Sequence, residues 1–509
     1  MNSRQPNPKL VLAAMCMALA TVVSAVSSLN VALPDVARDI HATQTQLQWI
    51  VDSYAVVFAG LLLLAGALGD HLGRRHVLLA GLAIFAVAAA SALLVDDPGA
   101  LIAVRAAMGL GAAAIMPATL SIITNVFPED QRDRAVSIWA GVAGASALVG
   151  LLISGALLEA FSWQSIFAFS TVLALLALIA AARVAPNSTA DDAPLDWGGG
   201  ALSALGLSTL VYAIIEGPDR GWTDPVTLSA FAVAVALMVA FVAWELRQDR
   251  PLLDPRLFRL PGFGAGTASI AVQFFAFFGF IFVILQYVQF VLGYSPFEAG
   301  AALTPIAVLM MGLSPRVPRV VARFGAARVG ALGLLLMGAG FGILSTAGTH
   351  SDYWLLLSGL IPLGAGAALA TTPATTAIVS SLPASKQGVA SAVNDLAREV
   401  GGALGIAVLG SALTDRYQAG VPHAIAGAPA EFAQRAHEAL PAALALAERL
   451  GPRGATLASQ AQAAFVDGLG LALVIAAAST VAAAAFVLWR AAERPLFASG
   501  RPTTKEELQ

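Results

Sequence analysis

The side chains that could carry chemistry in this sequence are charged groups set in or beside long apolar runs. Asp70, Arg74 and Arg75 stand in a short, glycine-punctuated hinge between two such runs. Further charges fall inside other runs, namely Asp52, Arg105, Asp395, Arg398 and Glu399. In such surroundings, carboxylates can take up and release protons, and they can form ion pairs with guanidinium groups that open and close. The sequence contains no H-E-x-x-H or G-x-S-x-G motif and only one cysteine, so we expect no enzyme, no cofactor and no metal site.

The composition is that of an integral membrane protein. Hydrophobic residues make up 58% of the chain, charged residues make up 12%, and the mean hydropathy is +0.79. Soluble domains carry about 25% charged residues. Because a helix of roughly 20 apolar residues crosses the bilayer core, we predict fourteen spans. They cover residues 10–33, 49–69, 77–95, 99–126, 135–158, 164–184, 197–216, 226–244, 263–292, 299–314, 328–347, 353–379, 389–412 and 467–488.

The distribution of basic residues predicts the orientation. An even number of spans puts both termini on one side of the membrane. Most of the 28 Lys and Arg residues then fall in cytoplasmic segments if the N-terminus is inside, as the positive-inside rule requires. We therefore expect a multi-pass protein of the cell membrane with both termini in the cytoplasm. We also expect it to contact lipid, to bind no nucleic acid and to function as a monomer.

Two short stretches recur at nearly the same offset. Pro117–Ile122 in the fourth span is echoed by Pro373–Ile378 in the twelfth, and the hinge Gly69–Arg75 by Val321–Ala327. Such a repeat predicts two related six-span halves with spans seven and eight inserted between them. The predicted division is an N-terminal bundle (1–185), a linker with two spans (186–261), a C-terminal bundle (262–490) that includes an outer loop (413–466), and a cytoplasmic tail (491–509).

With the hinge, the repeat and the span count in view, the chain resembles the fourteen-span drug:proton antiporters of the major facilitator superfamily, close to exporters of quaternary ammonium compounds. The hinge resembles the superfamily's loop motif, and Arg105 with Gly109 and Gly111 resembles its span-four motif. Trp49–Tyr54 and Asn30–Pro34 resemble segments of spans two and one in the fourteen-span branch. The resemblance implies an all-α membrane fold of two six-helix bundles plus two inserted spans.

The resemblance also implies that the hinge works as a gate. The Asp70 carboxylate would contact the start of a helix in the other half, near Gly388 and Val389, where the helix dipole favours a negative charge. We prefer this reading to a merely solvated turn. The predicted gating residues are Gly66, Asp70, Gly73, Arg74 and Arg75.

Proton coupling is expected at Asp52 and Arg105. Related antiporters usually carry an acid in span one where this chain has Ala25. Asp52 is then the leading proton carrier, with a simple interfacial carboxylate as the alternative. Arg105 lies deep enough that its guanidinium should face the bundle interior, with Asp52 as a possible partner.

The remaining charges and glycines are assigned structural roles. Asp395, Arg398 and Glu399 form an internal charge cluster at i, i+3 spacing, read as structural in preference to proton-coupling. Predicted helix-packing glycines are Gly109, Gly111, Gly141, Gly150 and Gly155. The last three survive from a span-five motif whose proline and one glycine are replaced here by Leu151 and Ser154.

The substrate cavity is expected beside spans one and nine. Its predicted residues are Asn30, Gln286, Tyr287 and Gln289, with Gln273 as a weaker candidate. Span nine also carries many phenylalanines, which suit lipophilic guests but are expected mostly to face lipid.

The leading function is proton-coupled efflux of lipophilic small molecules, such as drugs, biocides or antibiotics, by alternating access. A metabolite facilitator or proton symporter of the same fold is the first alternative. A membrane sensor or scaffold that does not transport is the second, with the outer loop as its contact surface.

Overall fold

The computed structural model describes residues 7–40, 44–188, 196–249, 251–383, 386–421, 430–438 and 440–493, and its regular elements in these ranges are helices. Fourteen of them are long and apolar enough to cross a membrane, which confirms the predicted number of spans. Helices suit this setting because each pairs its own backbone N–H and C=O groups, for which lipid offers no partner.

The first eight spans are single helices. They are α1 (Pro8–Asp39), α2 (Gln44–Leu72), α3 (Arg74–Ser91), α4 (Pro98–Val126), α5 (Glu129–Ala160), α6 (Gln164–Val184), α7 (Trp197–Arg220) and α8 (Pro225–Glu245). Side chains that bind the free N–H groups of the first turn fix several of their starts, as Asp97, Asp196 and Asp224 do for α4, α7 and α8.

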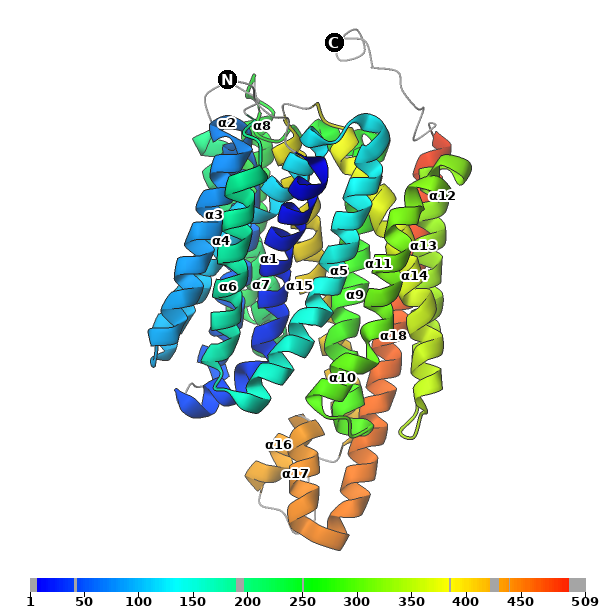
Figure 1. Cartoon of the computed structure of the whole chain (residues 1–509). Helices are drawn as coiled ribbons and strands as arrows, with labels where there is room; N and C mark the ends of the chain where they lie inside the picture. The colour runs from blue at the N-terminus through cyan, green and yellow to red at the C-terminus, as the bar shows by residue number, and fades with distance from the viewer. Residues whose placement is uncertain are drawn as a thin grey trace.

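The last six spans are less regular. They comprise α9 (Pro261–Gln286) with a π-helical turn (Tyr287–Val291), the broken span α10 (Pro296–Ala302), α11 (Thr304–Leu313) and α12 (Val317–Phe324), and then α13 (Ala326–Leu344), α14 (Tyr353–Ser380), α15 (Gln387–Gly420) and α18 (Ala455–Glu493). We call the end of the bundle where α1 begins and α18 ends the terminal face; it is at the top of Figure 1.

The expected outer loop is mostly helical. α15 continues to Gly420 and α18 starts at Ala455, and between them stand α16 (Ala430–Glu438) and α17 (Leu440–Leu450). The Tyr417 hydroxyl donates a hydrogen bond to the Ala436 carbonyl at 2.8 Å, which ties α16 to α15. In Figure 1 this group projects from the face opposite the termini.

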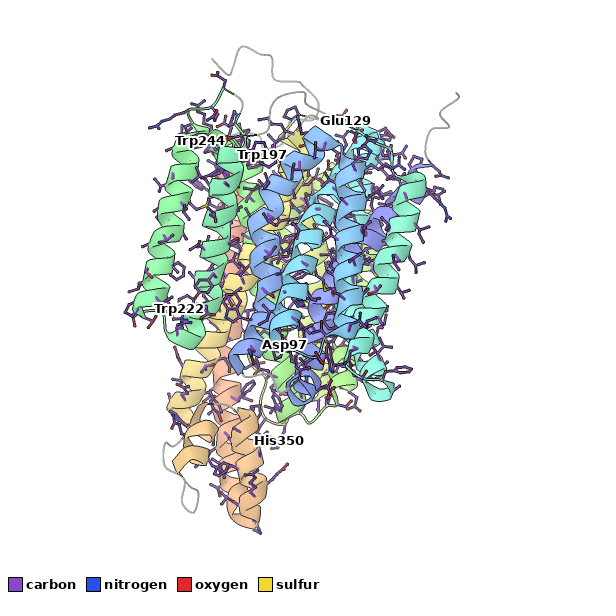
Figure 2. The ribbon with its side chains drawn as sticks, turned by 90° about the vertical axis from the view of Figure 1, so that its left-hand side faces the viewer. Asp97, Glu129, Trp197, Trp222, Trp244 and His350 are labelled. Carbon is purple, nitrogen blue, oxygen red and sulfur yellow. The ribbon has the colours of Figure 1, made fainter. Side chains whose placement is uncertain are left out.

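The inserted pair α7–α8 packs beside α2. The Ser208 hydroxyl donates to the Val56 carbonyl at 3.3 Å, and the Tyr212 ring stacks on Trp49 at 5.8 Å between centroids. At its far end the pair also reaches α15, because the Trp222 indole donates to the Ser411 hydroxyl at 3.4 Å. Figure 2 shows Trp197 and Trp244 at one end of the pair and Trp222 at the other, as expected for indoles at the two membrane interfaces.

Candidate functional site

Asp70 joins the first group of spans to the last at the terminal face. Its carboxylate accepts hydrogen bonds from the Gly388 N–H, at 3.1 and 2.9 Å to the two oxygens, and from the Val389 N–H at 3.3 Å. These donors belong to the first turn of α15, where backbone N–H groups lack helical partners and the dipole favours an anion. The contact that the resemblance implies is therefore present.

Arg74 completes this arrangement, which we call the hinge lock. Its Nε and Nη2 donate to the Asp70 carboxylate at 3.0 and 2.8 Å. Asp70 is 5% exposed and Arg74 1%, so the ion pair is buried. Water screens a buried pair little, and removing one partner leaves an uncompensated charge.

Glycines bring the backbones close enough for the hinge lock to form. A methyl group on Gly66 would lie 2.6 Å from the Gly388 carbonyl oxygen, so α2 and α15 touch backbone to backbone. Gly73 has φ +103°, a conformation that other residues rarely adopt, and it lets the chain turn from α2 into α3. Arg75 donates from Nη2 to the Ala182 carbonyl at 2.6 Å and so fastens the hinge to α6.

Arg105 faces the bundle interior, between α4 and α2. It is 2% exposed, its Nε donates to the Ile50 carbonyl at 3.1 Å, and its guanidinium lies 4.4 Å from the centre of the Tyr54 ring. Two other predicted residues, Asp52 and Asn30, have side chains outside the described part of the structure.

The predicted packing glycines differ in what they touch. A methyl group would come within 2.5 Å of the Tyr54 carbonyl at Gly109, 2.8 Å of the Gly81 carbonyl at Gly111 and 2.8 Å of Ser24 at Gly150. Gly141 has looser neighbours, at 3.3 Å, and Gly155 has none within 4 Å. Gly155 therefore serves no close helix approach here, because its face of α5 meets open space.

A small cavity of about 60 Å³ lies between the first and the last six spans. Its lining includes Val23, Met116 and Ala140 from the first spans and Gln273, Phe274 and Glu399 from the last. Drug-sized ligands occupy sites of about 300–1,000 Å³. The spans must therefore separate before the cavity can take such a guest.

The cavity is charged on its α15 side. The Arg398 guanidinium borders it, with Nη1 3.6 Å from an Asp395 oxygen. The same guanidinium lies 4.5 Å from the centre of the Phe274 ring and 5.2 Å from that of Trp139. Two residues of the predicted charge cluster, Arg398 and Glu399, thus line the cavity, and the aromatic partner on α5 had no signal in the sequence.

A buried polar network connects this cluster on α15 with α14, and a further bond connects α14 with α9. The Asn394 side chain donates to Asp395 at 3.2 Å and accepts from Thr375 at 3.0 Å. Nearer the cavity, Thr371 donates to the Gln273 side chain at 2.9 Å. The Asn394–Thr375 bond thus ties α15 to α14, and the Thr371–Gln273 bond ties α14 to α9.

The structure places the expected cavity residues of span nine away from the cavity. Tyr287 is fully buried and its hydroxyl donates to the Gly348 carbonyl at 2.7 Å, while Gln286 donates to the Phe282 carbonyl. Neither residue lines the cavity described above, and Gln289 does not line it either. The lining comes from earlier turns of α9, at Gln273 and at phenylalanines that we had expected mostly in lipid.

Within the described ranges, no group of three or more His, Cys, Asp or Glu side chains is arranged to hold a metal ion. The described residues of this site offer ion pairs, aromatic faces and a cavity-lining carboxylate.

Comparison with known proteins agrees with this arrangement. The chain matches the family model of the Major Facilitator Superfamily over residues 10–406. It is 33% identical to the tetracenomycin C resistance and export protein of Streptomyces glaucescens, over 94% of this chain and 91% of that one. It is 35% identical to the multidrug efflux pump LfrA of Mycolicibacterium smegmatis, over 90% and 91%.

Solved structures show the same fold at low sequence identity. The human organic anion transporter MFSD10 superposes with a TM-score of 0.58 at 16% identity, covering 94% of this chain and all of that one. The proton:xylose symporter XylE gives 0.58 at 16%, covering 96% of each chain. The family match and the relatives together show that this chain belongs to the Major Facilitator Superfamily.

Proposed function

We propose that this protein exports lipophilic small molecules, such as antibiotics and biocides, across the cell membrane in exchange for protons. The observation that carries the proposal is the cavity between the two groups of spans, which combines aromatic and apolar walls with the Glu399 carboxylate. The relatives named for multidrug efflux and antibiotic export support the substrate class.

The terminal face is the cytoplasmic one in this proposal, as the distribution of Lys and Arg indicates. The hinge lock then closes the cytoplasmic end, and it must open for a substrate to enter from the cytoplasm. The small cavity is consistent with a closed state between two open ones.

Two carboxylates compete for the role of proton carrier. Asp52 is the residue predicted from the sequence. Glu399 is the one that lines the cavity, so a proton and a substrate can exclude each other there directly. That mutual exclusion is what antiport requires, and we therefore favour Glu399. For an uncharged substrate, one proton moving inward through 100 mV supplies about 2.3 kcal/mol, which corresponds to a substrate gradient of about 50-fold. Exchange of one monovalent cation for one proton moves no net charge, so the pH gradient alone drives it.

Proteoliposomes with an imposed pH gradient test the proposal. A lipophilic dye should move against the proton flow in wild type, and Glu399→Gln should abolish the dependence on the gradient while leaving counterflow exchange of the dye. Asp52→Asn is the matched comparison, and loss of coupling there but not in Glu399→Gln would return the role to Asp52. Dye movement in the same direction as protons would instead indicate the symporter alternative.

A further inference from the structure

Arg398 occupies an unusual place for a charged side chain. It is 6% exposed and borders the cavity, and its Nη1 makes no hydrogen bond. Its guanidinium lies over two rings from different groups of spans, Phe274 on α9 and Trp139 on α5. The Trp139 indole is fully buried and is fixed by its own hydrogen bond to the Thr119 hydroxyl at 3.1 Å.

The two aromatic faces are good places for a positively charged guest. Ring faces attract cations through their quadrupole, and the attraction grows when water is excluded. Here both faces are already covered by a cation that the chain itself supplies. A guest that uses the same rings must therefore displace the Arg398 guanidinium.

We propose that Arg398 is a tethered occupant of the substrate cavity, covering the Trp139 and Phe274 rings while no substrate is present. This inference rests on the proposed transport function and assigns a residue that sets affinity. The nearby Asp395 oxygen, 3.6 Å away, offers the displaced guanidinium a place to go. Arg398 thus weakens the binding of every ring-stacking cation by competing with it.

The charges around the cavity support this role. Asp395 and Arg398 offset each other, which leaves Glu399 as the net charge of the cluster. A monovalent cation that replaces a proton on Glu399 then leaves the total charge of the cavity unchanged, and a low-dielectric site favours that balance. The exchange of one monovalent cation for one proton is neutral in itself. Arg398 contributes by balancing Asp395, so that Glu399 alone carries the charge that either the proton or the guest neutralises.

The tether also connects the two groups of spans. Trp139 belongs to α5, whereas Arg398 and Phe274 belong to α15 and α9. Displacing the guanidinium from Trp139 breaks a contact between α15 and α5 beside the cavity, so guest binding and separation of the spans favour each other.

The test is the affinity of purified protein for tetraphenylphosphonium, measured by titration calorimetry. Arg398→Met should bind the probe on the order of tenfold more tightly than wild type, the size expected from one desolvated cation–ring contact. The matched control is Arg323→Met. This change removes an arginine 5.4 Å from the centre of the Phe324 ring in an exposed hinge, and it should leave the affinity unchanged.

A charge-balanced variant separates competition for the rings from simple electrostatics. Asp395→Asn with Arg398→Met removes both charges of the pair, so the net charge equals that of wild type while the rings are free. Most of the gain should persist in this double variant. If the gain disappears there, the effect of Arg398 is only its charge, and the proposal is overturned.

Equal or weaker binding by Arg398→Met, or no binding of the probe by any variant, also overturns the proposal. If Arg398→Met does not fold, Arg398→Lys decides, because a lysine keeps the charge but cannot lie flat against both rings. An intermediate gain supports the tether, and affinity equal to wild type counts against it. Dye transport with no such gain would defeat this inference alone, whereas a gain in protein that shows no proton-coupled transport would defeat only the proposed function.

Discussion

The two hinges of this protein have a similar backbone conformation but differ in charge. The first runs from Gly69 to Arg75, and the second, Val321–Ala327, follows the broken span that ends in α12. Both turn at a glycine with positive φ, +103° at Gly73 and +84° at Gly325. The fold needs this turn twice, because each time two spanning helices must reverse within a few residues.

The ion pair, in contrast, occurs at one hinge only. Asp70 is buried against α15, whereas its counterpart Ala322 is exposed and has no charge to offer. The repeated part of the motif thus serves the architecture, and the part present once serves the opening and closing that we propose.

Asp70→Asn should reduce transport by at least about tenfold. The variant removes the charge of the buried Asp70–Arg74 pair on the Asp70 side and weakens the acceptor for the first turn of α15, and breaking a buried pair costs about 3–5 kcal/mol. Dye efflux in proteoliposomes measures the loss, and size-exclusion chromatography checks that the protein stays folded. Ala322→Asn is the control at the other hinge. Unchanged efflux in Asp70→Asn would show that the hinge lock has no role in gating.

Alanine at either turn glycine should lower thermal stability. Both glycines combine a positive φ with ψ of 124° and 147°, a region nearly closed to residues with a Cβ, so alanine there should cost of the order of 1–3 kcal/mol. At Gly325 nothing else stands within 4 Å, so Gly325→Ala should cost no more than this. At Gly73 a methyl group would also meet the end of the exposed Asn187 side chain at 2.6 Å, which must move aside, so Gly73→Ala should melt at a slightly lower temperature than Gly325→Ala. Equal melting temperatures for Gly73→Ala and Gly325→Ala would show that the contact with Asn187 has no cost.

Ala322→Asp should change transport by less than about twofold. An exposed carboxylate gains little from a nearby helix end, of the order of 0.3–1 kcal/mol. The first turn of α5, the corresponding helix of the other half, moreover carries Glu129 and Asp130, which repel it. Efflux rates beside wild type are the measurement. Strong inhibition of efflux by Ala322→Asp would mean that one carboxylate is enough to form a second lock. The charged residue would then be the only functional difference between the two hinges.

The fold was predictable because its signal is local: apolar run length defines the spans. The Asp70–Gly388 contact joins distant segments, and it was expected only because the hinge resembles the superfamily's loop motif. The residues that line the cavity were harder to predict from the sequence, because α9 carries apolar residues on every face. Which phenylalanines turn inward is decided by packing against α14 and α15, and no pattern within Gln273–Phe278 specifies it. The Trp139–Arg398 contact joins residues far apart in the chain, so neither residue suggests the other in the sequence.

The contacts of α7 and α8 indicate which other spans they would move with during transport. They hold α2 by a ring stack and a hydrogen bond near Trp49 and Ser208. They also meet α15, through the Trp222–Ser411 bond and through an apolar cluster that includes Leu207 and Val389. If the two bundles rock during transport, we expect the inserted pair to follow the N-terminal one, because its contact with α2 is the more extensive. The two moving bodies are then unequal, with eight spans in one and six in the other. The larger body exposes more surface to lipid, so the membrane opposes its rotation more strongly.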